Sequence, residues 1–397
     1  MKILVLNCGS SSIKYQLVDM DNNAAVMAKG LLERIGLEMG EFTHKYKGEK
    51  HYEQRPIPNH TEGIKIVLAA LTDATIGVIS SMQEVGAVGN RIAHGGELFK
   101  DSCLIDDHVI EQIKSLEPLA PLHTPGNLAG IYAMREVLPG VPQVAVFDTA
   151  FHQTMPPKAF YYALPYKYYT DYHIRRYGAH GTSHRFVTAR VGDYLGVDVS
   201  TKRIITCHIG NGASISAVKN GQCVDTSMGL TPLEGLMMGT RTGDIDSSAI
   251  LTIMEKEGLT TQQANDLLNK QSGMKGFTGV SSDMREIGAA IEAGNERCKI
   301  ALDMYTYRIK KYIGSYAAAM GGVDIVVFTA GVGEHQWDVR EAACIDMEFL
   351  GIKLDREKNR SVNGEEAIIS TPDSPVTVCV IPTDEELLIA RDTLALV

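Results

Sequence analysis

Residues 3–19, ILVLNCGSSSIKYQLVD, hold the pattern that decides the fold. The apolar runs Ile3–Leu6 and Ile13–Val18 predict two buried strands, because short runs rich in aliphatic and β-branched residues favour strands. The turn between them is small and polar, and this region offers three candidate phosphate contacts, Ser10, Ser12 and Lys14. Small residues let backbone N–H groups approach an anion, and the hydroxyls and lysine add donors and charge.

The turn is followed by a strand and not by a helix, so it is not a Walker loop. We therefore predict a phosphate-binding hairpin of a different type. An ordinary serine-rich turn is the alternative.

The same plan returns at residues 204–218, IITCHIGNGASISAV. If one residue is inserted, Gly9 aligns with Gly210, and Ser12-Ile13 aligns with Ser214-Ile215. A third glycine-rich segment, Gly331–Glu334, follows the strand-like run Ile325–Thr329 and is expected to be a loop. Repetition of a whole hairpin indicates an internal duplication and strengthens the phosphate-binding interpretation.

Nine motifs, spread in order over the whole chain, resemble those of the acetate kinase family. They are NCGSSSIK (7–14), RIAHGGE (91–97), PLHTPGN (121–127), VFDTAFH (146–152), RRYGAHGTSH (175–184), HIGNGAS (208–214), MGTRTGDID (238–246), GVGEH (331–335) and TDEE (383–386). The resemblance implies an α/β fold with duplicated actin/hexokinase-like (ribonuclease H-like) domains and a nucleotide cleft between them. It implies an N-terminal domain of residues 1–150 plus 383–397 and a C-terminal nucleotide-binding domain of residues 151–382.

Local signals predict further elements. Capping and periodicity place helices over Thr61–Leu71, Thr124–Leu138, Asp244–Glu257, Thr261–Lys270 and Arg297–Met320, and buried strands over Gln143–Phe147 and Val376–Ile381. Ser183 is expected to cap a helix that Gly196 ends. Thr383 and Glu386 are expected to form the capping box of the last helix. Residues 151–172, rich in Pro and Tyr, are expected to be irregular.

Composition limits the class of protein. The 397 residues suffice for two domains with cores of their own, and a content of 44% hydrophobic and 22% charged residues is typical of globular proteins. A net charge of -10 argues against a general nucleic-acid-binding surface. The seven cysteines are widely spaced without a CxxC, so we expect reduced core thiols in a cytoplasmic protein and no zinc site. We also expect neither a signal peptide nor a membrane span.

Phosphoryl transfer requires positioning, a metal ion and positive charge around the moving group. The resemblance assigns the catalytic roles to Asp148, His180 and Arg241. It assigns Mg²⁺, or Mn²⁺ in its place, to Asn7 and Glu385. A general base is the first guess for Asp148, but acetate is already ionised at pH 7. We expect Asp148 to hold a metal-bound water or to orient Arg241.

The resemblance assigns substrate binding to Arg91, Ala93, Leu122, His123, Ala179 and Pro232. In this family we expect valine at the position of Ala93 and phenylalanine at that of Ala179. With alanine at both, propionate should be used better than by a relative that has the bulky residues. The alternative is that the Tyr-rich segment 161–172 fills the space.

Nucleotide binding is assigned by the resemblance to three segments and to the lysine after the first turn. The residues are Lys14, His208, Ile209, Gly210, Asn211, Gly212, Asp283, Met284, Arg285, Gly331, Val332, Gly333, Glu334 and His335. Position 335 departs from the asparagine that we expect there.

The function that the resemblance implies is reversible, Mg²⁺-dependent transfer of the γ-phosphoryl group from ATP to acetate, by direct in-line transfer in a cytoplasmic homodimer. A propionate kinase or another short-chain acyl kinase is the closest alternative. An ATP-driven chaperone or filament of the same fold, and a non-catalytic sensor of acetyl phosphate, are alternatives from other classes.

Overall fold

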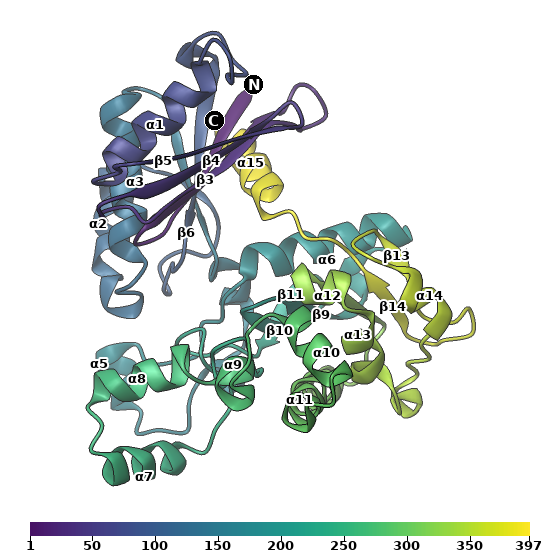
Figure 1. Cartoon of the computed structure of the whole chain (residues 1–397). Coiled ribbons are helices and arrows are strands. Elements are labelled where there is room, and N and C mark those ends of the chain that lie inside the picture. The colour runs from purple at the N-terminus through teal and green to yellow at the C-terminus, as the bar shows by residue number, and fades with distance from the viewer. The chain divides into compact units, whose positions relative to one another are not determined.

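A computed structural model describes all 397 residues, which divide into two compact units (Figure 1). Unit 1 comprises Met1–Phe151 and Asp384–Val397, and unit 2 comprises His152–Thr383. None of the helices combines the length and the apolar character needed to cross a bilayer.

Unit 1 is built on an eight-stranded sheet in the order β5-β4-β3-β2-β1-β6-β8-β7. Its strands are β1 Lys2–Cys8, β2 Ser12–Asp19, β3 Ala25–Glu33, β4 Gly40–Tyr46, β5 Glu49–Arg55, β6 Val85–Ile92, β7 Cys103–Leu104 and β8 Gln143–Phe147. Its helices are α1 His60–Thr72, α2 Asp107–Ser115, α3 Thr124–Val137 and α15 Glu385–Leu396, with 3-10 turns η1 Met82–Glu84, η2 Glu117–Leu119 and, at the boundary with unit 2, η3 Ala150–Thr154.

Alternation along β1 explains why this sheet is covered on both faces. Leu4 and Leu6 pack in one core with residues of α1 and α3, whereas Ile3 and Val5 pack in a second core with Ile389 of α15. Successive side chains of a strand point to opposite faces, so a fully apolar strand needs helices on both. The C-terminal helix is therefore an integral layer of unit 1.

Unit 2 has a six-stranded sheet in the order β11-β10-β9-β12-β14-β13. Its strands are β9 Arg203–Ile209, β10 Ala213–Lys219, β11 Gln222–Thr226, β12 Ile325–Thr329, β13 Ala367–Ile368 and β14 Thr377–Val380. Its helices are α4 Pro157–Phe160, α5 Lys167–Tyr172, α6 Gly181–Leu195, α7 Ser247–Glu257, α8 Thr261–Lys270, α9 Gly273–Thr278, α10 Met284–Glu292, α11 Glu296–Met320, α12 Ala330–His335, α13 Trp337–Cys344 and α14 Arg356–Ser361, with 3-10 turns η4 Val199–Thr201 and η5 Glu348–Leu350.

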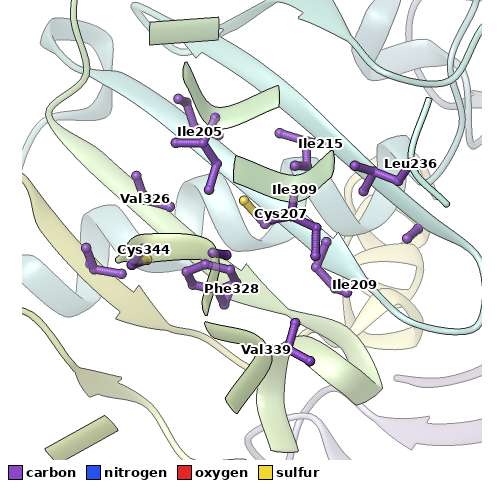
Figure 2. Close-up of a cluster of buried hydrophobic side chains, with 14 of the residues drawn as sticks. Ile205, Cys207, Ile209, Ile215, Leu236, Ile309, Val326, Phe328, Val339 and Cys344 are labelled. Carbon is purple, nitrogen blue, oxygen red and sulfur yellow. The ribbon is translucent and has the colours of Figure 1, made fainter. Parts of the chain in front are cut away.

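The largest core of unit 2 lies on one face of this sheet. Figure 2 shows Ile205, Cys207 and Ile209 of β9 together with Ile309 of α11 and Phe328 of β12, all of them buried. The alternate residues of β9 face α6 and include polar side chains. The sheet of unit 2 therefore has one apolar face and one face that carries polar side chains.

The two sheets repeat one plan, and the predicted α/β fold with a duplicated core is confirmed. In unit 1 the antiparallel strands β3-β2-β1 are followed by β6 and β8, which are parallel to β1. In unit 2 the antiparallel strands β11-β10-β9 are followed by β12 and β14, which are parallel to β9. Each N-terminal hairpin therefore lies at the same place in its sheet.

The alignment predicted between the two hairpins is wrong beyond the turn. The first turn is closed by the pair Cys8 and Ile13, and the second by Ile209 and Ala213. The second turn is thus one residue shorter, and by register Lys14 matches Ser214. The alignment of Ser12 with Ser214 by residue type therefore differs by two residues from the register that the backbone pairing sets.

Two predictions of helix caps also need correction. Helix α6 begins after His180, and Ser183 is buried in its first turn. Helix α15 is capped by Asp384, whose side chain accepts from the backbone N–H of Leu387, so the predicted capping box is absent. In α15 an adjacent residue, Asp384, caps the helix in place of Thr383, whereas the N-cap position of α6 is His180, three residues before Ser183.

Two segments are more regular than predicted. Gly331–Glu334 lies in the short helix α12 and not in a loop, because the Glu334 carboxylate turns back to accept from the backbone N–H of Ala330 at 2.7 Å. Residues 151–172 contain the short helices α4 and α5 instead of being wholly irregular. All seven cysteines are free thiols, as predicted, and only Cys103 is not fully buried.

Candidate active site

The carboxyl edge of the unit 1 sheet gathers three of the predicted residues. Strands β1, β6 and β8 are parallel, so their C-terminal ends lie at one edge, where ligands of α/β proteins gather. Asn7 lies near the end of β1, Arg91 near the end of β6, and Asp148 directly follows β8. Arg91 Nη1 donates to Asn7 Oδ1 at 3.2 Å, and its Nη2 is paired with the buried Asp148 carboxylate.

Helix α15 adds two carboxylates to this edge. Glu386 is paired with Lys14 of β2, so Lys14 belongs to the charged cluster of unit 1. Desolvation, together with the charge of Asp148, raises the pKa of the Glu385 carboxyl. Burial alone would lower the pKa of Arg91, but the charges of Asp148 and Glu385 raise it. This edge thus holds closely spaced carboxylates with two nearby cations.

The donor set at this edge suits a hard cation. No group of three or more His, Cys, Asp or Glu side chains is placed to hold a metal ion by itself. Mg²⁺ needs no such cage, because it binds through one or two carboxylates, phosphate oxygens and several waters. The amide oxygen of Asn7 and the carboxylate of Glu385 are ligands of the kind that this mode uses.

The β1–β2 turn is held by side chains that the sequence did not single out. His60 Nε2 donates to the Gly9 carbonyl at 2.8 Å, and Asn127 Nδ2 donates to the Cys8 carbonyl at 2.7 Å. Asn127 Oδ1 also accepts from the backbone N–H of Ala93 at 3.0 Å. Asn127 therefore ties a predicted substrate residue to the hairpin. It lies in one of the quoted motifs, but no role had been assigned to it.

The remaining predicted residues of unit 1 differ in exposure. Ser10, Leu122 and His123 are exposed, while Ser12 is half-buried at the start of β2. His123 is the N-cap residue of α3.

Unit 2 places a second group of predicted residues around the β9–β10 turn. The His180 and His208 rings are stacked with their centroids 4.1 Å apart. His180 precedes α6 with a left-handed backbone, φ 58°. A Cβ atom at Gly212 in the turn would lie 3.4 Å from Arg241 Nη1 and 3.6 Å from His180 Nε2. The turn, the imidazole and the guanidinium are therefore neighbours.

Arg241 is set in a loop that charged side chains hold in place. Its Nη1 donates to the Pro232 carbonyl at 3.3 Å, and burial lowers the pKa of its guanidinium. Arg176 Nη2 donates to Glu234 at 2.6 Å, and Asp244 Oδ1 accepts from the backbone N–H of Gly235 at 2.8 Å. The loop that carries Pro232 and Arg241 is thus fixed at several points.

Hydroxyl groups that sequence reasoning missed hold the two imidazoles. Ser183 Oγ lies 2.7 Å from His208 Nδ1 and 2.8 Å from Thr383 Oγ1. Ser214 Oγ lies 2.9 Å from His180 Nδ1. The backbone of Ala179, a predicted substrate residue, is held through its carbonyl, which accepts from His152 Nε2 at 3.0 Å. Serine is common in turns and caps, so nothing in the sequence marked these hydroxyls as partners of the imidazoles.

A cavity of about 500 Å³ in unit 2 unites the predicted nucleotide segments. Of the predicted residues, the cavity is lined by Gly210, Asn211, Asp283, Met284, Arg285, Gly331, Val332 and His335. Volumes of this order are typical of small-molecule sites. Arg285 is exposed and paired with Asp283, with 2.5 Å between Nη2 and Oδ2. His335 Nδ1 lies 2.9 Å from Asn363 Oδ1.

The other predicted nucleotide residues do not line this cavity. Ile209 and Gly333 are buried, and the Glu334 carboxylate accepts backbone N–H groups of Ala330 and Thr383. His208 and Gly212 lie on the His180 side of the turn, and Lys14 belongs to unit 1. Sequence reasoning missed five lining residues, Gly239, Met274, Ser282, Tyr305 and Gln336.

Gly239 shows why one missed residue is required. A Cβ atom there would lie 1.9 Å from Asn211 Oδ1, and its backbone N–H donates to the Asn211 carbonyl at 3.0 Å. A side chain at 239 would force the Asn211 amide group to move. The requirement comes from a contact between distant segments, which the sequence alone does not display.

Comparisons with known proteins identify the family of the chain. The profile of the Acetokinase family matches residues 2–391. An acetate kinase of Thermotoga maritima is 57% identical over 395 residues, covering 99% of this chain and 98% of that protein, and one of Bacteroides thetaiotaomicron is 59% identical over 396 residues, covering 99% of each.

Solved structures give the same result. The crystal structure of Porphyromonas gingivalis acetate kinase superposes with a TM-score of 0.97 at 52% identity and 99% coverage of both chains. A propionate kinase from Francisella tularensis superposes with a TM-score of 0.92 at 37% identity, covering all of both chains.

Proposed function

Because the chain belongs to the acetokinase family, a family of kinases that phosphorylate a carboxylate, we propose that it catalyses ATP + acetate ⇌ ADP + acetyl phosphate. The single observation that carries this choice is full-length identity of 57–59% to curated acetate kinases. The cavity in unit 2 supports a nucleotide as one substrate, and the charged edge of unit 1 supports an anionic, metal-bound group.

We propose direct in-line transfer. A carboxylate oxygen of acetate attacks the γ-phosphorus; the new P–O bond forms as the bond to the β,γ-bridging oxygen breaks, and ADP leaves. Acetate is ionised at pH 7, so no proton needs to be removed before attack. Arg91 and Arg241 supply positive charge to the carboxylate and the phosphoryl oxygens, and His180 donates a hydrogen bond to the group in flight.

Asp148 serves orientation in this scheme and is not a general base. Its carboxylate is buried and already paired with the Arg91 guanidinium, which it holds in one direction. Asn7 and Glu385 would hold Mg²⁺ or Mn²⁺. When bound, such an ion would supply positive charge to the phosphate oxygens during transfer.

Propionate is the second candidate substrate, and two observations favour it. Positions 93 and 179 are alanine, where bulkier residues are expected in the family. The propionate kinase of F. tularensis also shares the fold at 37% identity. Acetate remains the first choice because curated relatives at much higher identity are acetate kinases.

We further propose that the protein acts as a homodimer in the cytoplasm. The resemblance to the family supports the dimer. The seven free thiols accord with a reducing compartment.

The test is a turnover assay with ATP, Mg²⁺ and acetate, in which hydroxylamine traps acetyl phosphate as the hydroxamate. We expect hydroxamate and ADP in equal amounts, with propionate as a second acceptor. ADP formation without hydroxamate would indicate an ATPase, as in a chaperone or filament. Binding of acetyl phosphate without any turnover would indicate a sensor.

A further inference from the structure

A line of buried polar side chains in unit 2 ends on His180. Thr206 Oγ1 lies 2.7 Å from His184 Nδ1, His184 Nε2 lies 2.7 Å from Ser214 Oγ, and Ser214 Oγ lies 2.9 Å from His180 Nδ1. Thr206, His184 and Ser214 are completely buried, whereas His180 is partly exposed. We call these three residues the polar chain. None of them has a role in the scheme above.

Three elements of the fold place the polar chain next to His180. Thr206 lies on β9, Ser214 on the neighbouring strand β10, and His184 in the first turns of α6. The His184 carbonyl accepts from Thr188 Oγ1, and His180 is the N-cap residue of the helix. The polar chain is therefore held by two strands and a helix and has little freedom to rearrange.

The number of protons on the polar chain allows two directions of hydrogen-bond donation along it. Burial, followed by the neighbouring His152 and His208, lowers the pKa of His184 well below its ordinary value, so its ring is neutral and carries one N–H. Each hydroxyl also has one proton. The donations therefore run either from Thr206 to His180 or, all reversed, from His180 to Thr206.

The distances favour donation toward His180. In the reverse direction, the Thr206 hydroxyl proton would be left to the Ser216 carbonyl at 3.5 Å, which is at the limit of a hydrogen bond. In the forward direction, it goes to His184 Nδ1 at 2.7 Å, and every later donation spans 2.9 Å or less.

We propose that Ser214 donates to His180 Nδ1 and so holds the proton of the neutral His180 ring on Nε2, which makes Ser214, His184 and Thr206 positioning residues. Nε2 is the nitrogen on the side of Gly212 and Arg241. A proton there lets His180 donate to a phosphoryl oxygen, whereas a lone pair there would repel it. The mechanistic value of this tautomer rests on the proposed function, but the tautomer itself does not.

The tautomer can be read without substrate. We would label the full-length protein with ¹⁵N-histidine and record two-bond ¹H–¹⁵N correlations, whose pattern distinguishes a proton on Nδ1 from one on Nε2. The signals of His180 are identified by their loss in His180→Gln. The expected result is the Nε2–H tautomer. An Nδ1–H tautomer in the unmodified protein would overturn the proposal, whether or not acetate is phosphorylated.

A matched pair of variants tests the positioning role. Ser214→Ala should mix the His180 tautomers and lower kcat roughly 10–100-fold, the range seen when a supporting hydrogen bond to a functional group is lost, with KM for ATP little changed. Ser216→Ala is the control, because that hydroxyl is equally buried on the same strand but pairs with Thr226 at 2.8 Å. It should keep both the tautomer and kcat.

Restoring the hydroxyl completes the test. Ser214→Thr should recover the Nε2–H tautomer and most of kcat. If Ser214→Ala keeps the Nε2–H tautomer and the kcat of Ser216→Ala, Ser214 does not position His180. If Ser214→Ala fails to fold, the spectrum of the unmodified protein and the Ser214→Thr variant still decide.

Discussion

The β1–β2 hairpin of unit 1 and the β9–β10 hairpin of unit 2 occupy equivalent places in their sheets, but the side chains beside them differ in kind. Arg91, Asp148 and Glu385 make the first edge charged. His180, His208 and buried hydroxyls make up much of the second, with Arg241 as its nearby cation. The two units share one backbone arrangement around the hairpin, but the side chains beside the hairpin differ. The charged edge suits a cation, and the other suits directed hydrogen bonds.

The strongest way to break this comparison is to replace the guanidinium of the second edge by an ammonium group. Arg241→Lys should lower kcat by roughly 10²–10³, because a point charge replaces a preorganised fork of donors. Steady-state kinetics with ATP and acetate measure this loss. Arg360→Lys is the control, since that guanidinium lies 5.0 Å from the centre of the Trp337 ring and outside both edges. Near-normal turnover of Arg241→Lys would remove Arg241 from the catalytic residues.

At the charged edge, Asp148→Asn should lower kcat roughly 10–100-fold, because Arg91 loses the carboxylate that orients it. Since Asp148 removes no proton, the residual rate should not respond to added carboxylate bases. We would compare acetate, fluoroacetate and propionate as acceptors, with Asp107→Asn at the surface as control. Rescue of Asp148→Asn by small carboxylates would restore the general-base interpretation.

A smaller effect is expected at the acyl end. Ala179→Phe should shift the ratio of kcat/KM for acetate over propionate toward acetate by about fivefold or more, since one methylene contributes about 1–3 kcal/mol to discrimination. The backbone of residue 179 is already fixed by His152, so the ring has a defined starting point. An unchanged ratio would mean that residue 179 does not line the acyl end.

The smallest expected effect is on the pH dependence of the unfolding free energy. It tests whether the second edge is built from neutral, hydrogen-bonding side chains. The pKa of His184 is lowered by burial in the folded state, so the unfolded chain binds the proton more readily. Stability due to neutral His184 is present above pH ~6.5 and is lost as pH falls below that value. The slope of unfolding free energy below pH ~6.5 should be shallower in His184→Asn, by up to about 1.4 kcal/mol per pH unit.

The only tryptophan, Trp337, lies in unit 2, so its fluorescence during urea unfolding reports on that unit. His108→Asn is the control, because His108 is exposed on α2 of unit 1. It should leave the pH slope unchanged. Equal slopes for His184→Asn and the unmodified protein would show that His184 is not held neutral.

Much of this organisation could be predicted from sequence, for physical reasons. Apolar runs beside glycine turns identified both hairpins, and residues at strand ends, such as Asp148, fell at the expected edge. What could not be predicted depends on contacts between distant segments. Gly239 is needed because of Asn211, and Ser214 matters because α6 brings His180 and His184 to it. Where two adjacent residues can both cap a helix, as Thr383 and Asp384 can, composition does not choose.

Direct transfer from ATP to acetate is tested most directly by the stereochemistry at phosphorus. We would start from ATP made chiral at the γ-phosphorus with oxygen isotopes and determine the configuration of the phosphoryl group in the acetyl phosphate formed. A single in-line displacement predicts inversion. Retention would require two displacements through a phosphorylated side chain, and it would contradict direct transfer.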